Sequence, residues 1–383
     1  MTNAAARSGE IVGKVHLAGR WVSARVGWRD GLIVAIEPSN DGGQEPFYLV
    51  PGFVDLHCHG GGGADLMDAG DAPHIVARTH ARYGAAAFLA TTMTAPLDEV
   101  EAALAAVARA MKCQEDDEAE ILGVHLEGPF ISPDQLGAQP PFTLPATVEL
   151  LERLCAIAPI KVITIAPEAD PSGLVAAWLR NNGVRVQIGH TAVGLETAVD
   201  WIRHHADGVT HLFNAMGGFH HRKSGCSGAA LAYADHAELI ADLIHADRGA
   251  ALTALRAIPR IYAVTDGTAA TGMPDGTYRL GQHTVIRQGD TVRLESGGLA
   301  GSCLTMDVAF QNLVSIGLSL EDATNRTSTI AAAYVGVERY GRLEVGAPAT
   351  FVGVDEKGRR KNVVMNGDIL RCHHGAPACT ATT

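Results

Sequence analysis

The chain has 383 residues, of which 47% are apolar and 19% are charged, and its formal net charge is −12. It is long enough to bury a large core, and its composition is that of an ordinary globular protein. The acidic balance excludes a protein that binds nucleic acid or an anionic membrane through clustered lysine and arginine.

The N-terminal residues 9–50 are predicted to form short β-strands separated by turn residues. Residues 346–371 show the same pattern, with two strands on either side of a polar turn that carries the basic run 357–361. We expect these segments to pair as a small β-sandwich domain, built from residues 1–50 and 346–383.

The middle of the chain, residues 51–345, alternates strand-like runs with helical patterns such as 97–112 and 192–206. The last run is followed by a long insertion at 271–302 and by two helical stretches, 303–317 and 321–335. Eight parallel strands with intervening helices predict an α/β fold, a (β/α)8 TIM-type barrel. The eight runs are residues 49–57, 85–92, 120–127, 160–167, 184–190, 208–213, 239–245 and 260–266.

The ends of these runs carry the residues suited to chemistry. In such a barrel the active site lies at the C-terminal ends of the strands. A lone histidine there is more often a hydrogen-bonded structural residue, but unrelated structural residues have no reason to gather at one end of successive strands. Six of the eight runs end in a candidate ligand or acid-base residue: His57 and His59, Glu127, His190, His211, His245 and Asp266.

Imidazole and carboxylate donors without thiolates suit Zn²⁺ or Fe²⁺ in a catalytic site. A bound metal lowers the pKa of a coordinated water to about 7, which supports hydrolysis of an amide, ester or amidine. By its position, Asp266 is predicted to transfer the proton. The loop after the sixth run, 211-HLFNAMGGFHHRKSG-225, adds Arg222 as a candidate anion contact.

Cys58 lies between two candidate ligands, His57 and His59. Side chains alternate along a strand, so Cys58 is predicted to face outward against the helices. The glycines at 60–63 are predicted to leave room for metal and substrate at the barrel mouth. The seven cysteines show no framework spacing, so no disulfide scaffold is expected. The N-terminus lacks the apolar core of a signal peptide, and we expect a cytoplasmic protein.

Six motifs resemble those of the N-acetylglucosamine-6-phosphate deacetylase family of the amidohydrolase superfamily, over nearly the whole chain. The resemblance implies hydrolysis of N-acetylglucosamine 6-phosphate to glucosamine 6-phosphate and acetate, in amino-sugar catabolism and cell-wall recycling. The motifs are PGFVDLHCHG (51–60), HLEGPFIS (125–132), GHT (189–191), HLFNAM (211–216), VTDG (264–267) and LAGSCLTMD (299–307).

The resemblance also implies roles for individual residues. Glu127, His190 and His211 match the ligands of a principal metal, and Asp266 matches the catalytic acid/base. His57 and His59 match a pair that holds a second metal in some relatives. The implied cofactor is therefore one or two divalent ions per subunit, with Zn²⁺ expected and Fe²⁺ as the alternative. The implied substrate contacts are Ala138, Gln139, Asn214, Ala215, Arg222, His245, Leu299, Ala300 and Gly301.

Two further implications concern the substrate site. Arg222, His245 or both are expected to reach the substrate phosphate from a partner subunit, which implies a homodimer. Relatives commonly carry Lys-Gly-Ala-His where this chain has 136-LGAQPP-141. Gln139 can donate a hydrogen bond but cannot carry charge. We therefore expect the chain to depend more on metal as a Lewis acid, which favours two ions.

Two other functions remain open. One is a different amidohydrolase, such as a cyclic amidase or a nucleobase deaminase; Lys161, at the start of its strand-like run, disfavours a cyclic amidase, which needs a lysine at the strand end. The other is a sugar-phosphate-binding protein without catalysis, in which Asp266 would have no purpose.

Overall fold

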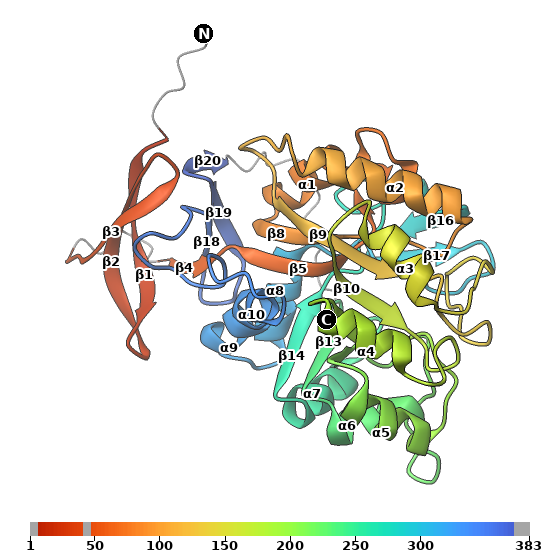
Figure 1. Cartoon of the computed structure of the whole chain (residues 1–383). Helices are drawn as coiled ribbons and strands as arrows, with labels where there is room; N and C mark the ends of the chain where they lie inside the picture. The colour runs from red at the N-terminus through yellow and green to blue at the C-terminus, as the bar shows by residue number, and fades with distance from the viewer. Residues whose placement is uncertain (1–6, 41–46, 371–383) are drawn as a thin grey trace.

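The computed structural model of the chain describes residues 7–40 and 47–370. Residues 371–383, which belong to the predicted C-terminal β segment, lie outside the described residues, as do residues 1–6 and 41–46. The remainder forms a barrel of strands and helices beside a separate β-sheet (Figure 1). No helix of the described residues combines the length and apolarity needed to cross a membrane.

The predicted barrel is confirmed. Six parallel strands form one sheet in the order β5-β8-β9-β10-β11-β12, and β13 pairs in parallel with β14. Two backbone hydrogen bonds join these parts into a ring, from Leu212 N–H to the Glu238 carbonyl and from Asp266 N–H to the His57 carbonyl, both 2.9 Å. The strands are β5 (Phe53–Cys58), β8 (Ala85–Thr91), β9 (Glu120–Glu127), β10 (Ile160–Ile165), β11 (Arg185–Ile188), β12 (Gly208–Val209), β13 (His236–Ile240) and β14 (Arg260–Val264).

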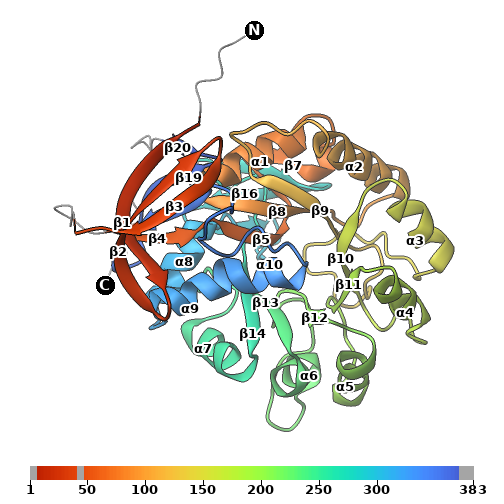
Figure 2. The ribbon, with the colours of Figure 1, turned by 60° about the vertical axis from the view of Figure 1, so that its left-hand side comes forward.

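The helices that alternate with these strands along the chain lie around their outside (Figure 2). Helix α2 shows why they pack there: Val100, Leu104 and Val107 recur at helical spacing and are buried. The Thr147 and Asp247 side chains accept hydrogen bonds from the first turns of α3 and α7. The helices are α1 (Ala72–Arg82), α2 (Leu97–Ala110), α3 (Val148–Cys155), α4 (Leu174–Asn181), α5 (Leu195–His204), α6 (Gly225–Tyr233) and α7 (Arg248–Ala257).

Strands from both ends of the chain form one seven-stranded sheet, in the order β20-β19-β18-β4-β1-β2-β3. It has a core of its own, in which Trp28 and Phe351 meet edge to face with ring centroids 5.6 Å apart. The basic run 357–361 begins in the predicted turn between β18 and β19 and continues into the first two residues of β19. The strands are β1 (Gly9–Leu17), β2 (Arg20–Arg29), β3 (Leu32–Pro38), β4 (Tyr48–Pro51), β18 (Phe351–Val354), β19 (Arg360–Met365) and β20 (Asp368–Leu370).

The predicted strand 49–57 is two strands. Residues 48–51 pair with β1 and β18 in the seven-stranded sheet, and residues 53–58 pair with β8 in the barrel. Gly52 lies between them, and a Cβ at this position would lie 2.7 Å from the Ala86 Cβ. The first barrel strand is therefore a direct continuation of the other sheet.

The predicted strand 239–245 ends earlier, at Ile240. The Asp242 carboxylate accepts hydrogen bonds from the backbone N–H groups of Ile244 and His245, both at 2.9 Å. Such local side-chain bonds compete with strand pairing and turn the chain. His245 therefore lies in a loop beyond the strand end.

The insertion after β14 forms a three-stranded antiparallel sheet, β15 (Gly276–Leu280), β16 (His283–Gln288) and β17 (Thr291–Leu294). The predicted helix 303–317 is α8 (Met306–Ser315). The predicted helix 321–335 is α9 (Leu320–Thr324) and α10 (Ile330–Tyr334), joined by a π-helical turn at Asn325–Thr329. In this turn the Ser328 hydroxyl donates to the Gly52 carbonyl at 2.6 Å. Short elements complete the fold: β6 (Gly60–Gly61), β7 (Ala64–Asp65) and a 3₁₀ turn at Leu66–Asp68.

Helix α8 is held on the barrel by Phe310, which is fully buried against Phe53 with ring centroids 5.6 Å apart. We expect Phe310→Ala to lower the free energy of unfolding by about 3–5 kcal/mol, because a buried aromatic ring is replaced by a cavity. The urea midpoint measures this. Val308→Ala is the control on the exposed face of the same helix, where Val308 is 42% exposed, and should leave the midpoint nearly unchanged. Equal midpoints for the two variants would contradict the assignment of Phe310 to the core.

Candidate active site

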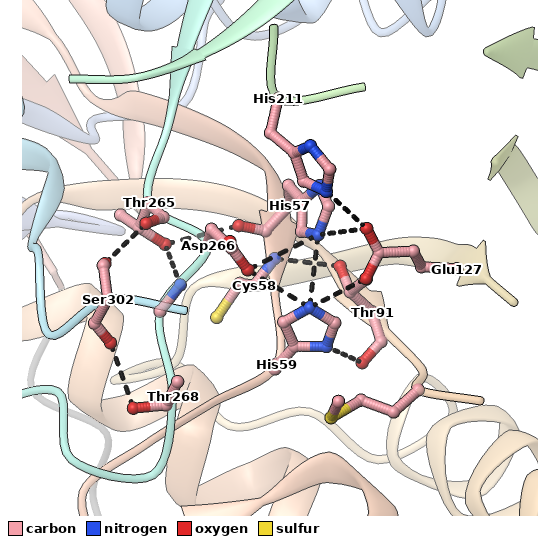
Figure 3. Close-up of polar contacts among 12 residues, drawn as sticks. His57, Cys58, His59, Thr91, Glu127, His211, Thr265, Asp266, Thr268 and Ser302 are labelled. Atoms are coloured by element: carbon pink, nitrogen blue, oxygen red, sulfur yellow. Dashed lines mark hydrogen bonds and ion pairs between the residues drawn. The ribbon is translucent and has the colours of Figure 1, made fainter. Parts of the chain in front are cut away.

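The predicted strand ends bring a buried group of imidazoles and carboxylates together at one end of the barrel (Figure 3). His57 and His59 come from the end of β5, and Glu127 ends β9. Asp266 lies two residues beyond β14, in the left-handed region with φ +49°. Figure 3 shows these side chains directed at one another.

A first cluster consists of Glu127, His190 and His211. Glu127 Oε1 lies 3.2 Å from His190 Nε2 and 2.9 Å from His211 Nε2, and the two nitrogens are 3.0 Å apart. Both histidines have positive φ, +47° and +23°, so the chain turns sharply just after β11 and β12 to direct their rings inward. The three donor atoms lie close enough together to hold a metal ion.

A second cluster consists of His57, His59 and Asp266. His59 Nε2 lies 3.2 Å from His57 Nε2 and 3.2 Å from Asp266 Oδ1. It also lies 3.2 Å from Glu127 Oε2. Glu127 therefore contacts both clusters, with Oε2 on His59 and Oε1 on the first cluster and, at 3.5 Å, on His57.

The hydrogen bonds on the far side of two of the rings, those of His59 and His190, show that this donor set fits a cation. Nδ1 of His59 faces the Thr91 carbonyl at 3.2 Å, and Nδ1 of His190 faces the Gln135 carbonyl at 2.9 Å. A carbonyl oxygen can only accept, so each Nδ1 carries a proton, and Nε2 is the nitrogen that can bind a metal ion. These Nε2 atoms face carboxylate oxygens, and a divalent ion that replaced their protons would bind the lone pairs of both.

The same charges determine the protonation of the group. Burial alone would lower the pKa of His57, but the charges of Glu127 and Glu238 raise it well above its ordinary value. Burial likewise opposes protonation of His59, but hydrogen bonds to Asp266 and Glu127 raise its pKa to about 9. Burial would raise the pKa of Asp266, yet His59 and His57 hold it at about 2. The site therefore favours positive charge between ionised carboxylates.

A cavity of about 150 Å³ opens over the two clusters. The structure brings most of the predicted substrate contacts to its wall, but neither Arg222 nor Ala300. Ala300 is fully buried and packs into the core of the three-stranded sheet, and Arg222 lies exposed in the loop before α6. The predicted residues that line the cavity are His59, Glu127, Ala138, Gln139, His190, His211, Asn214, Ala215, His245, Asp266, Leu299 and Gly301.

Gln139 is fixed between two partners. Its Nε2 donates to Glu127 Oε2 at 2.6 Å, and its Oε1 accepts from the Thr94 N–H at 2.7 Å. The side chain is buried in this position. Gln139 therefore braces the carboxylate that both clusters share, at the cavity wall.

Cys58 faces away from the clusters, toward α1, where its Sγ lies 3.1 Å from His80 Nε2. The prediction that the following glycines clear space for metal and substrate was wrong. A Cβ on Gly60 would lie 2.6 Å from the Ala269 nitrogen, and one on Gly62 would overlap the Thr79 hydroxyl. These glycines let the chain pack tightly against α1 and the loop after β14.

Sequence reasoning missed residues of two kinds. Met93, Gly137 and Leu280 also line the cavity. Met93 follows a predicted strand end, but a methionine there is neither a typical ligand of Zn²⁺ nor an acid-base residue. Below the clusters, Glu238 accepts from His57 Nδ1 at 2.9 Å. Glu238 lies within β13, where it carries no positional signal beyond being an acid in an apolar strand.

Comparisons with known proteins agree with this architecture. The amidohydrolase family matches residues 48–370. An N-acetylgalactosamine-6-phosphate deacetylase from Escherichia coli O157:H7 is 37% identical over 89% of this chain and 93% of its own length. An N-acetylglucosamine-6-phosphate deacetylase from Lysinibacillus sphaericus is 39% identical over 81% of this chain and 82% of its own.

Two solved structures extend the similarity to the fold. A mutant N-acetyl-D-glucosamine-6-phosphate deacetylase from Mycobacterium smegmatis, with one aspartate replaced by alanine and N-acetyl-D-glucosamine-6-phosphate bound, superposes with a TM-score of 0.86. It is 26% identical, and the match covers 94% of this chain and 99% of that one. The enzyme from Thermotoga maritima gives a TM-score of 0.83 at 28% identity over 94% and 99% of the two chains.

The second cluster predicts a second ion. We expect the double variant His57→Asn, His59→Asn to bind one divalent ion fewer per chain than the unaltered protein, because two of the three side chains of that cluster lose their imidazoles. Metal analysis after equilibrium dialysis measures this. The matched control is His204→Asn, His205→Asn at the end of α5, which should leave the count unchanged. An unchanged count in the first variant would reject the two-ion arrangement.

Proposed function

Because this chain belongs to the amidohydrolase family, we propose that it hydrolyses N-acetylglucosamine 6-phosphate to glucosamine 6-phosphate and acetate. One observation carries the proposal. Two imidazole-carboxylate clusters share Glu127 beside an ionised Asp266, in a cavity at the C-terminal ends of the barrel strands. That position is where barrel enzymes place their chemistry.

We propose that Glu127, His190 and His211 bind the principal ion, and that His57 and His59 bind a second one with Glu127 shared between them. Zn²⁺ is the ion we propose, since nitrogen and carboxylate donors suit it, and Fe²⁺ accepts the same donors. When bound, such an ion polarises the acetyl carbonyl and lowers the pKa of a coordinated water.

Asp266 is the proposed acid-base residue. It lines the cavity, and its depressed pKa keeps it ionised at neutral pH, so it can accept a proton. In the proposed reaction its carboxylate takes the proton of the attacking water and then gives it to the departing amine nitrogen. Asp266 Oδ1 lies 3.2 Å from His59 Nε2, so both transfers would take place beside the proposed metal ligands.

The remaining residues of the cavity would position the substrate. His245 and Asn214 are the proposed contacts of the phosphate within this chain, while Gln139, Leu299 and Gly301 would lie against the sugar and its acetyl group. Arg222 is exposed and does not line the cavity of its own chain. We infer that Arg222 reaches the phosphate of a partner subunit in a homodimer, where its paired donors would bind two phosphate oxygens.

A second substrate is favoured by one comparison. The relative from Escherichia coli O157:H7 is an N-acetylgalactosamine-6-phosphate deacetylase, 37% identical to this chain. The two sugars differ only in the orientation of one hydroxyl group. Comparing kcat/KM for both sugar phosphates decides between them, and we expect the higher value for N-acetylglucosamine 6-phosphate.

The structure offers less support for a cyclic amidase, a nucleobase deaminase or a binding protein without catalysis. Cyclic amidases need a lysine among the metal ligands, but Lys161 is the second residue of β10 and lines a different hollow, with Arg180 and Arg185. A nucleobase deaminase would release ammonia. A binding protein without catalysis would retain the sugar phosphate unchanged.

We expect Asp266→Asn to lower kcat by roughly 10²- to 10⁴-fold, because the amide cannot accept the proton. Metal content and substrate binding should persist. Acetate release, measured beside ammonia release, follows the reaction. Asp200→Asn on α5 is the control at an exposed carboxylate, and its kcat should equal that of the unaltered protein. Undiminished deacetylation by Asp266→Asn would remove this residue from the mechanism, and ammonia in place of acetate would reject the proposed function.

His245 gives the proposed phosphate contact a pH dependence. Its pKa is raised: burial opposes protonation, but the hydrogen bond to Asp242 at 2.6 Å and the charges of Asp242 and Asp266 outweigh burial and the opposing Arg293. The ring is therefore protonated over a wider pH range than a free histidine, and it loses its charge as the pH rises through the raised pKa. We expect KM to rise roughly ten- to hundredfold across that transition, the value of a charge-assisted hydrogen bond.

Asp242→Asn tests whether the charge of Asp242 raises the pKa of His245. The amide oxygen can still accept from the backbone, but the charge that raises the pKa of His245 is lost. The rise in KM should then begin at lower pH than in the unaltered protein. A KM profile that does not move would contradict a protonated His245 at the phosphate.

A further inference from the structure

Glu238 lies directly beneath the two clusters and has no role in the chemistry described so far. It is in the middle of β13, its side chain points into the barrel, and it is fully buried. A buried carboxylate is costly unless it is paired or hydrogen-bonded. Its partners therefore indicate what it does.

The partners of Glu238 belong to both clusters. Its Oε2 lies 2.9 Å from Nδ1 of His57 and 3.2 Å from the backbone nitrogen of His211. Its Oε1 lies 3.5 Å from the Tyr262 hydroxyl. One carboxylate oxygen thus contacts a proposed ligand of each ion.

The contact with His57 selects one tautomer. An ionised carboxylate accepts at Nδ1, so Nδ1 keeps its proton and Nε2 is the nitrogen that can bind a metal ion. Nε2 is the nitrogen that faces His59 at 3.2 Å and Glu127 at 3.5 Å. The contact with His211 acts on the backbone, where φ is +23° and the chain needs support to hold the ring inward.

Two other side chains of the layer around Glu238, His125 and Gln187, carry no charge. His125 packs edge to face against His57 with centroids 4.5 Å apart, and its Nδ1 donates to the Leu56 carbonyl at 3.0 Å. Burial lowers the pKa of His125 to about 4, so it stays neutral. Gln187 donates to the Tyr262 hydroxyl at 2.7 Å. Glu238 therefore supplies the negative charge in this layer.

We propose that Glu238 is a positioning residue that fixes the tautomer and orientation of His57 and supports the backbone of His211, so that the two donor clusters face the same space. This inference rests on the metal-ligand roles proposed for His57 and His211. Residues that hold ligating histidines through Nδ1 typically change metal affinity by 10- to 100-fold when they are removed.

The experiment compares three variants by titration with Zn²⁺ against a competing chelator. Glu238→Ala removes the acceptor, and Glu238→Gln keeps an oxygen near His57 but removes the charge. Glu118→Gln is the matched control, because the buried Glu118 carboxylate also accepts from a histidine Nδ1, that of His74 at 2.9 Å, away from the clusters. The urea midpoint of each variant is measured in parallel.

We expect Glu238→Ala to weaken the binding of one Zn²⁺ by roughly 10- to 100-fold and Glu238→Gln to weaken it by a smaller factor. Glu118→Gln should lower the urea midpoint and leave both affinities unchanged. If Glu238→Ala does not fold, the nearly isosteric Glu238→Gln decides alone. Unaltered Zn²⁺ affinity in a folded Glu238 variant, or an equal loss in Glu118→Gln, would overturn the proposal.

The test is independent of turnover. If the protein deacetylates its substrate but binds a single ion, and the affinity for that ion does not depend on Glu238, the positioning role is wrong. The proposed function would still hold. A protein whose Zn²⁺ binding depends on Glu238 but which releases no acetate supports the positioning role and overturns the proposed function.

Discussion

The arrangement of the site depends on one buried carboxylate, Glu127. It is almost fully removed from water, so its charge has to be balanced inside the protein. Oε1 faces His190 and His211, while Oε2 faces His59 and receives the Gln139 amide. These partners come from different strands and loops, so the requirement to balance one charge fixes how the mouth of the barrel is assembled.

Much of the fold could be predicted from the sequence, because alternation of strand-like and helical patterns is a local property that each segment carries. The strand boundaries that were predicted wrongly depend on single residues, whose effect the strand and helix pattern does not show. The run 49–57 looks like one strand, yet Gly52 divides it between two sheets. The sequence of a strand does not show which other strands it will pair with. β13 ends early because Asp242 hydrogen-bonds to the backbone that follows it.

The residues of the candidate site are likewise of two kinds, those that the sequence predicts and those that only the structure shows. Residues at strand ends, such as Glu127 and Asp266, were found because the barrel brings strand ends together. Residues that act from within a strand, such as Glu238, look like exceptions in an apolar pattern, and only the three-dimensional structure shows what they contact. Ala300 came from family resemblance alone and Arg222 from the resemblance and from its loop after the sixth run, and in this chain neither lines the cavity.

The division of the first run at Gly52 limits how far the seven-stranded sheet could be replaced or redesigned. β4 and β5 are one nearly continuous stretch of chain, and the Ser328 hydroxyl is bonded to the carbonyl of the residue between them. His57 and His59 therefore stand on a strand whose other end is anchored in a separate sheet. That sheet is not an interchangeable module: its replacement or redesign would have to preserve the exit path of β4, or the register of two active-site histidines would be lost with it.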